Sequence, residues 1–170
     1  EVTGIAAGDS GLVYAIDAQN GDLYRSDNYG LEWQEMTKYL DQSDATLPAT
    51  LIAVAPDNEG IVAALTDSGT KLFVSLDGGF EWEDMHLPSL STGEEVTSLA
   101  ISEVYSDGDD EYREIAVGTA FWGDDLSNGE VYVLQGGCTW SYWEEQELTV
   151  DTTAPVHLGA DVATLAYSTG

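Results

Sequence analysis

The sequence predicts an all-β protein built from repeated four-stranded antiparallel units. A six-residue motif recurs four times, and each copy begins a series of short strand-like runs separated by turn residues. No longer window carries sustained helical periodicity. The four copies of the motif are VTGIAA at 2–7, ATLIAV at 49–54, VTSLAI at 96–101 and VATLAY at 162–167.

The spacing of these copies identifies the repeated unit. Ala6, Ala53, Ala100 and Ala166 fall into register at intervals of 47, 47 and 66 residues. A period of about 45 residues is typical of a four-stranded β-propeller blade. We therefore predict one partial β-propeller over residues 1–170, with blades at about 1–36, 49–85 and 96–144 and the start of a fourth at about 161–170.

Within each blade, runs rich in Val, Ile, Leu and Tyr alternate with Gly, Asp, Asn and Ser turns. The pair Asn20-Gly21 favours a tight hairpin, and residues 34–42 could hold a helical turn between blades. The third blade has longer, acidic connections at 106–111 and 122–129. The predicted strands are 2–7, 12–17, 22–26 and 32–36; then 50–55, 60–66, 70–75 and 81–85; then 96–102, 113–119, 129–134 and 139–144.

Composition excludes several classes of partner. The chain has 32 Asp and Glu against 4 Lys and Arg, a formal net charge of −28, so it lacks the basic side chains that hold nucleic acid. No apolar stretch approaches the length of a membrane-spanning helix, so we expect no membrane insertion in this segment. The single cysteine, Cys138, excludes an intrachain disulfide and a cysteine-rich metal site.

The turns that precede the fourth predicted strand carry the most specific motif. Residues 26–33 read SDNYGLEW and residues 75–82 read SLDGGFEW, 49 residues apart. Both resemble the Asp-box of neuraminidase-type (BNR) repeats, Ser-x-Asp-x-Gly-x-Thr-Trp. Ser and Asp or Asn side chains can bond turn amides, Gly permits a left-handed backbone, and Trp can pack between blades. The box residues are Ser26, Asn28, Gly30 and Trp33 in the first copy, Ser75, Asp77, Gly79 and Trp82 in the second, and Gly137, Thr139 and Trp140 in a degenerate third copy at 133–140.

The resemblance implies a structural role for these boxes, away from the face where propellers of this family bind ligands. Those propellers have six or more blades and close into a ring. Three blades leave two open sheet edges, so we expect this chain to be part of a longer polypeptide or to be closed by other copies.

Enzyme chemistry finds little support in the sequence, and we predict no catalytic residues. The sialidases of this family need an arginine triad, whereas this chain has only Arg25 and Arg113. His86, His157 and Cys138 lie in loops without a recognisable catalytic setting. A glycan-binding or glycoside-hydrolase propeller, with a site mainly outside this segment, is the alternative, and Trp122, Tyr142 or Trp143 could contact a sugar.

Calcium is the ion that the acidic loops favour, because it takes oxygen ligands. No other cofactor is predicted. The candidate ligands are Asp107, Asp109, Asp110, Asp124 and Asp125.

The resulting functional prediction is a non-catalytic, extracellular structural or interaction module of a cell-envelope or surface-layer-like assembly. Its partners would be other protein chains or further blades, and glycans under the alternative. An assembly factor or sorting receptor of the same fold is a third class. For photosystem assembly factors a basic patch toward the partner is expected, and the chain has only four basic residues.

Overall fold

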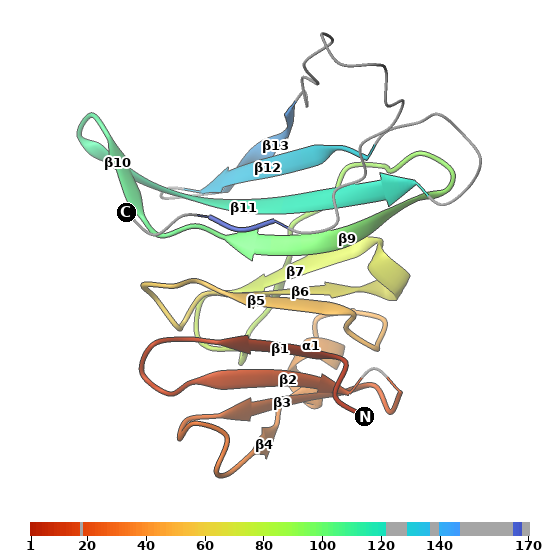
Figure 1. Cartoon of the computed structure of the whole chain (residues 1–170), viewed down its shortest axis with the longest axis vertical. Helices are drawn as coiled ribbons and strands as arrows, with labels where there is room; N and C mark the ends of the chain where they lie inside the picture. Colours follow the sequence, from red (N-terminus) through yellow and green to blue (C-terminus); the bar gives the residue numbers. More distant parts are fainter. Residues whose placement is uncertain (18, 122–128, 137–139, 147–164, 168–170) are drawn as a thin grey trace, which may run out of the picture. The chain divides into compact units, whose positions relative to one another are not determined.

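The computed structural model describes residues 1–17, 19–121, 129–136, 140–146 and 165–167, which form three antiparallel sheets (Figure 1). The chain divides into two compact units, one of residues 1–87 with 101–103 and one of residues 88–100 with 104–170. The predicted all-β class is confirmed. No helix among the described residues has the length and apolarity needed to cross a membrane.

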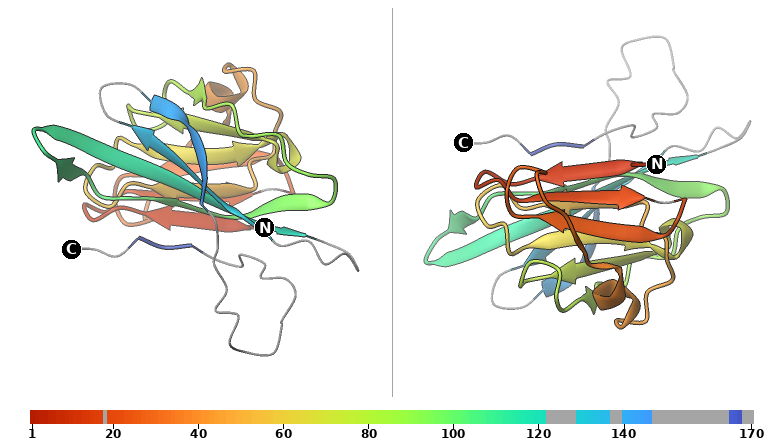
Figure 2. Two further views of the ribbon diagram at one scale, coloured as in Figure 1. Left: turned by 90° about the horizontal axis from the view of Figure 1, so that it is seen from above. Right: turned by 90° about the horizontal axis from the view of Figure 1, so that it is seen from below.

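The first unit contains the first two predicted blades, each with its strands paired in sequence order. In the right-hand view of Figure 2, the first sheet (red to orange) lies over the second (yellow). The first sheet consists of β1 (Gly4–Ala7), β2 (Val13–Asp17), β3 (Asp22–Ser26) and β4 (Gln34–Glu35). The second consists of β5 (Leu51–Val54), β6 (Val62–Thr66), β7 (Lys71–Ser75) and β8 (Glu83–Asp84), with a 3-10 turn at Asp67–Gly69.

Local chemistry explains the hairpin between β2 and β3. The Asp17 carboxylate accepts hydrogen bonds from the amides of Gln19 and Asn20 at 3.1 and 3.2 Å. Gly21 has a φ of 83°, a left-handed backbone conformation that glycine adopts without a steric penalty. The Asn20-Gly21 pair thus forms the tight turn that the sequence predicts. The predicted helical turn is also present as α1 (Thr37–Asp41).

The core of this unit lies between the two sheets. Strand β1 contacts β5, and α1 contributes the fully buried Leu40. Because successive residues of a strand face opposite sides, each blade contributes one alternating set to this interface. The buried cluster consists of Leu12, Tyr14, Ile16, Leu23, Met36, Leu40, Ala45 and Ala49 together with Val62, Ala64, Phe73 and Trp82.

The second unit contains the third predicted blade, in which β9 (Glu94–Ile101) pairs with β11 (Asp110–Phe121) and β11 is followed by β12 (Val131–Gly136) and β13 (Trp140–Gln146). One local prediction is wrong. Most of residues 106–111, predicted as a connection, lie in a hairpin between β10 (Tyr105–Asp107) and an extended β11. Tyr105 pairs with Tyr112 across this hairpin, their rings 6.1 Å apart, and Gly108 turns the chain with a φ of 70°.

The two box tryptophans should differ in their contribution to stability. Trp82 is 9% exposed within the core cluster, whereas Trp33 is 44% exposed. We expect Trp82→Ala to lower the free energy of unfolding by about 3–5 kcal/mol because it leaves a cavity, and Trp33→Ala by about 1 kcal/mol. Urea denaturation followed by circular dichroism measures both changes, and equal losses would contradict this account of the core.

Candidate functional site

The second box turn, residues 75–82, is held by side-chain hydrogen bonds to its own backbone. The Ser75 hydroxyl accepts from the amide of Gly79 at 2.8 Å and donates to the Asp77 carboxylate at 2.8 Å. The same Asp77 oxygen accepts from the amides of Phe80 and Glu81 at 3.0 and 2.9 Å. Partial burial opposes ionisation of Asp77, but these hydrogen bonds outweigh it and lower its pKa.

The glycine and tryptophan of this turn complete the arrangement. Gly79 has a φ of 92°. A Cβ at this position would lie 3.4 Å from the Trp82 ring and 3.6 Å from Tyr14 and Met36. The indole of Trp82 donates to the Gly79 carbonyl at 2.9 Å. The turn therefore places Trp82 against the first blade.

The first box turn, residues 26–33, shares two of these backbone contacts with asparagine in place of aspartate, whereas its Leu31 amide bonds the Asn28 main-chain carbonyl. The Ser26 hydroxyl accepts from the Gly30 amide at 2.9 Å, and the Asn28 side-chain oxygen accepts from the Glu32 amide at 2.8 Å. The side-chain amide oxygen of Asn28 thus accepts the hydrogen bond that the Asp77 carboxylate accepts in the second turn. In the degenerate third copy, Gly137 and Thr139 lie outside the described residues, and Trp140 pairs with Gly136 beyond a register shift in β12.

Arg25, a residue of β3, lies between the first two blades. Its guanidinium is 2.8 Å from Asp27 and 5.5 Å from the centre of the Phe80 ring. The Arg25 Nε is buried and makes no hydrogen bond within the part of the chain that the structure describes. A cavity of about 290 Å³ adjoins Arg25, Asp27, Glu59 and Asp77, and Glu59 accepts hydrogen bonds from the amide and hydroxyl of Ser10. These contacts join the turns of the two blades.

The candidate calcium ligands are not brought into one cluster by the described residues. Asp107 and Asp110 pair across the β10–β11 hairpin, and Asp109 is exposed at its tip. Asp124 and Asp125 lie outside the described residues. Among the residues that are described, no group of three or more His, Cys, Asp or Glu could hold a metal ion. Calcium binding stays a prediction.

The structure describes only some of the candidate sugar-contact residues and histidines. Trp122, His157 and Cys138 lie outside the described residues. Trp143 is in β13 and is half-buried opposite Leu134. His86 is exposed beside Asp84, with its ring nitrogen 3.5 Å from the carboxylate.

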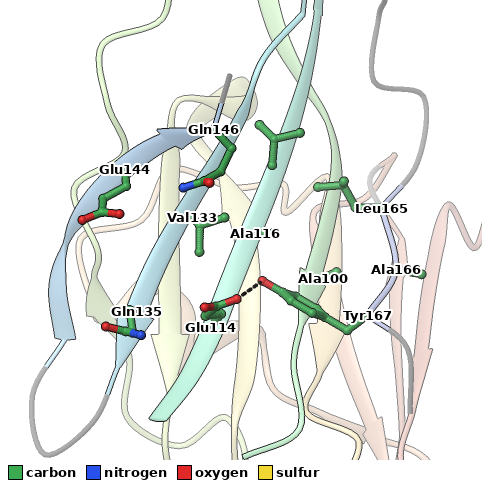
Figure 3. Close-up of a pocket in the computed structure, with 11 residues that line it drawn as sticks. Ala100, Glu114, Ala116, Val133, Gln135, Glu144, Gln146, Leu165, Ala166 and Tyr167 are labelled. Carbon is green, nitrogen blue, oxygen red and sulfur yellow. Dashed lines mark hydrogen bonds between the residues drawn. The ribbon is translucent and has the colours of Figure 1, made fainter. Parts of the chain in front are cut away.

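A second cavity lies on one face of the third blade (Figure 3). It has a volume of about 470 Å³, within the usual range for ligand pockets. Its apolar part is formed by Ala100, Ala116, Val131 and Val133, and its polar part by Glu114, Gln135, Glu144 and Gln146. Leu165, Ala166 and Tyr167 border it on the other side.

A hydrogen-bonded network fixes one end of this cavity. The Glu114 carboxylate accepts a hydrogen bond from the hydroxyl of Tyr105 at 2.7 Å. It also accepts one from the hydroxyl of Tyr167 at 3.3 Å (Figure 3). Gln135 donates its amide to the Tyr105 hydroxyl at 2.7 Å. Burial, with the nearby charge of Glu114, raises the pKa of Tyr167, so its hydroxyl stays protonated and can donate.

Sequence reasoning missed this cavity. Its polar residues occur singly along three strands, and only the pairings Glu114 with Gln135 and Val133 with Glu144 place them on one face. Neither β12, VYVLQG, nor β13, WSYWEEQ, alternates regularly between polar and apolar residues, so no local pattern marked this face.

Comparison with known proteins supports the fold. No family model matches the chain, and no curated protein matches it. Among solved structures, it is similar to an ancestral GH74 enzyme, with 18% sequence identity and a TM-score of 0.51 over 85% of this chain and 18% of the enzyme. It is also similar to YCF48 bound to D1 peptide, with 12% identity and a TM-score of 0.49 over 89% of this chain and 40% of YCF48.

The GH74 enzyme is a β-propeller, so the chain has the fold of β-propeller blades. It spans less than half the length of either protein. At this level of identity the similarity concerns the fold alone.

The second box turn should contribute to acid sensitivity. Because the pKa of Asp77 is lowered in the folded chain, its stabilisation is present above about pH 4 and is lost as the pH falls below that value. We expect Asp77→Asn to keep the turn, as Asn28 does in the first blade, and to reduce the loss of stability below pH 4. Urea denaturation at pH 3 to 7 measures this, with Asn28→Asp as the reciprocal control. Identical pH profiles in wild type and Asp77→Asn would refute the role assigned to the carboxylate.

The contact between blades should also be sensitive to alkali. Tyr14 is fully buried, its hydroxyl donates to the Gly78 carbonyl at 2.8 Å, and burial raises its pKa to about 12 against the opposing charge of Arg25. The stabilisation is therefore complete below about pH 10 and is lost as the pH rises through 12. We expect Tyr14→Phe to cost about 1 kcal/mol at pH 8 and to lose less stability than wild type between pH 10 and 12. Equal losses over that interval would show that Tyr14 does not titrate with unfolding.

Proposed function

We propose that this chain is a non-catalytic, extracellular interaction module, a segment of β-propeller blades within a cell-envelope or surface-layer-like assembly. The observation that carries the proposal is an apolar face of the first blade that is exposed, although the equivalent face of the second blade is covered. Exposed contiguous apolar surface is typical of protein interaction sites.

The internal repeat supplies a residue-by-residue comparison. Trp33 lies over Gly30 at 3.3 Å as Trp82 lies over Gly79 at 3.4 Å, each distance taken from the glycine's Cβ position. Trp33 is 44% exposed and Trp82 is 9% exposed. The two turns therefore have the same local geometry, and only the second is covered.

Leu31 and Phe80 precede these tryptophans by two residues, and they are 82% and 38% exposed. Phe80 is the less exposed of the two because it packs edge-on against Tyr39 of α1, with ring centres 5.2 Å apart, and also contacts Arg25. We define the open face by Ile5, Leu31 and Trp33, whose exposed fractions are 67%, 82% and 44%.

The charge of the chain supports an assembly in an environment rich in cations. At a net charge of −28, copies repel one another at low ionic strength. Calcium or high salt would weaken this repulsion and allow the open faces to meet. Apolar contact would then supply the affinity, and the ionic conditions would control association.

The proposal predicts cation-dependent association through the open face. In sedimentation velocity, we expect the wild-type chain to be mainly monomeric in low salt and to associate when millimolar calcium is added. We expect Leu31→Glu to weaken this association at least about tenfold, because burial of a leucine is worth about 1.5–3 kcal/mol.

The matched control is Leu76→Glu, since Leu76 is also exposed, at 63%, but lies outside the open face. It should change the association constant less than about twofold. A wild-type chain that stays monomeric at all salt and calcium concentrations, or equal effects of the two variants, would overturn the proposal.

A further inference from the structure

The sheet face of the third blade that carries the cavity has smaller side chains than the corresponding face of the second blade. In the second blade, Ala63 pairs with Val74 and Leu65 pairs with Leu72. In the third blade the corresponding pairs are Ala116 with Val133 and Gly118 with Val131. Two leucines are thus replaced by glycine and valine, and of these Val131 lines the cavity.

The polar lining has one sign of charge. The described residues that line the cavity include the carboxylates Glu114 and Glu144 and no lysine or arginine. The two glutamines add neutral donors and acceptors. Only four basic residues occur in the whole chain, so the surrounding field also favours a cation.

The two carboxylates differ in their surroundings. Glu114 is held at one end by the hydroxyls of Tyr105 and Tyr167, which fixes the orientation of its side chain. Glu144 is exposed on β13, opposite Val133 on the same sheet face (Figure 3). The apolar strip is formed by Ala116, Val131 and Val133. A ligand packed on this strip would have the Glu114 carboxylate on one side and the Glu144 carboxylate on another.

We propose that this cavity binds a lysine or arginine side chain presented by a partner protein. Such a side chain has an apolar stem and a cationic head, which match the apolar strip and the carboxylate rim. Binding of this kind is separate from the open face of the first blade and does not depend on self-association.

The probe for this proposal is the peptide acetyl-Gly-Lys-Gly-Lys-Gly-amide, titrated by isothermal calorimetry into the Leu31→Glu variant at low ionic strength. This variant removes the first-blade contact, so the result is independent of the association test. We expect one site that is lost at high salt. The same peptide with acetylated lysines should bind at least about tenfold more weakly, because it lacks the charge.

Variants of the chain locate the site. We expect Glu144→Gln to weaken binding of the lysine peptide about fivefold to tenfold. The matched control is Glu83→Gln, because Glu83 pairs with Val74 in the second blade as Glu144 pairs with Val133 in the third. It should change the affinity less than about twofold. Val131→Leu, which restores the residue type of the second blade, should also weaken binding while circular dichroism shows an unchanged fold.

Three results would overturn the proposal. Equal binding of the acetylated peptide would remove the role of charge, and equal effects of Glu83→Gln and Glu144→Gln would show a diffuse attraction to the acidic surface. Displacement of the peptide by a neutral oligosaccharide such as cellohexaose, with no loss in Glu144→Gln, would make the cavity a glycan site instead.

Discussion

The packing of Trp82 and Tyr14 across the first two blades is the contact on which the structure of the first unit depends. Trp82 reaches this position because the second box turn bends the chain at Gly79, and the Tyr14 hydroxyl then binds the carbonyl of the adjacent Gly78. One turn therefore joins the local backbone to the core between the sheets. A side chain at Gly79 would require a left-handed backbone, and its Cβ would be in van der Waals contact with the Trp82 ring.

The need to cover both faces of a sheet explains why equivalent residues of the first two blades differ in exposure. A four-stranded sheet has two faces, and burial of both requires a neighbour on each side. The first blade covers one face of the second, and the open face of the first blade shows the same residue pattern without a cover. The exposure of these first-blade residues is therefore informative, because the covered residues of the second blade show what kind of contact the same positions make.

Net charge acts against these apolar contacts over longer distances. With 32 acidic residues, the chain resists association unless cations reduce the repulsion. In the third blade, small apolar residues and carboxylates line the same cavity. The open face and the cavity thus differ in chemistry, one depending on apolar burial and the other on charge.

The sequence by itself determined the all-β class, the blade period and the box turns, because these depend on local preferences and on residues a fixed distance apart. Asn20-Gly21, the Ser75-to-Trp82 motif and the helical turn after residue 34 all act over a few residues. The sequence did not reveal the third-blade cavity, the position of Arg25 between blades or the extended β10–β11 hairpin. Each of these depends on which strands pair and in which register. Only the tertiary structure decides that, because Glu114, Gln135 and Glu144 share a face through the register in which the consecutive strands β11, β12 and β13 pair.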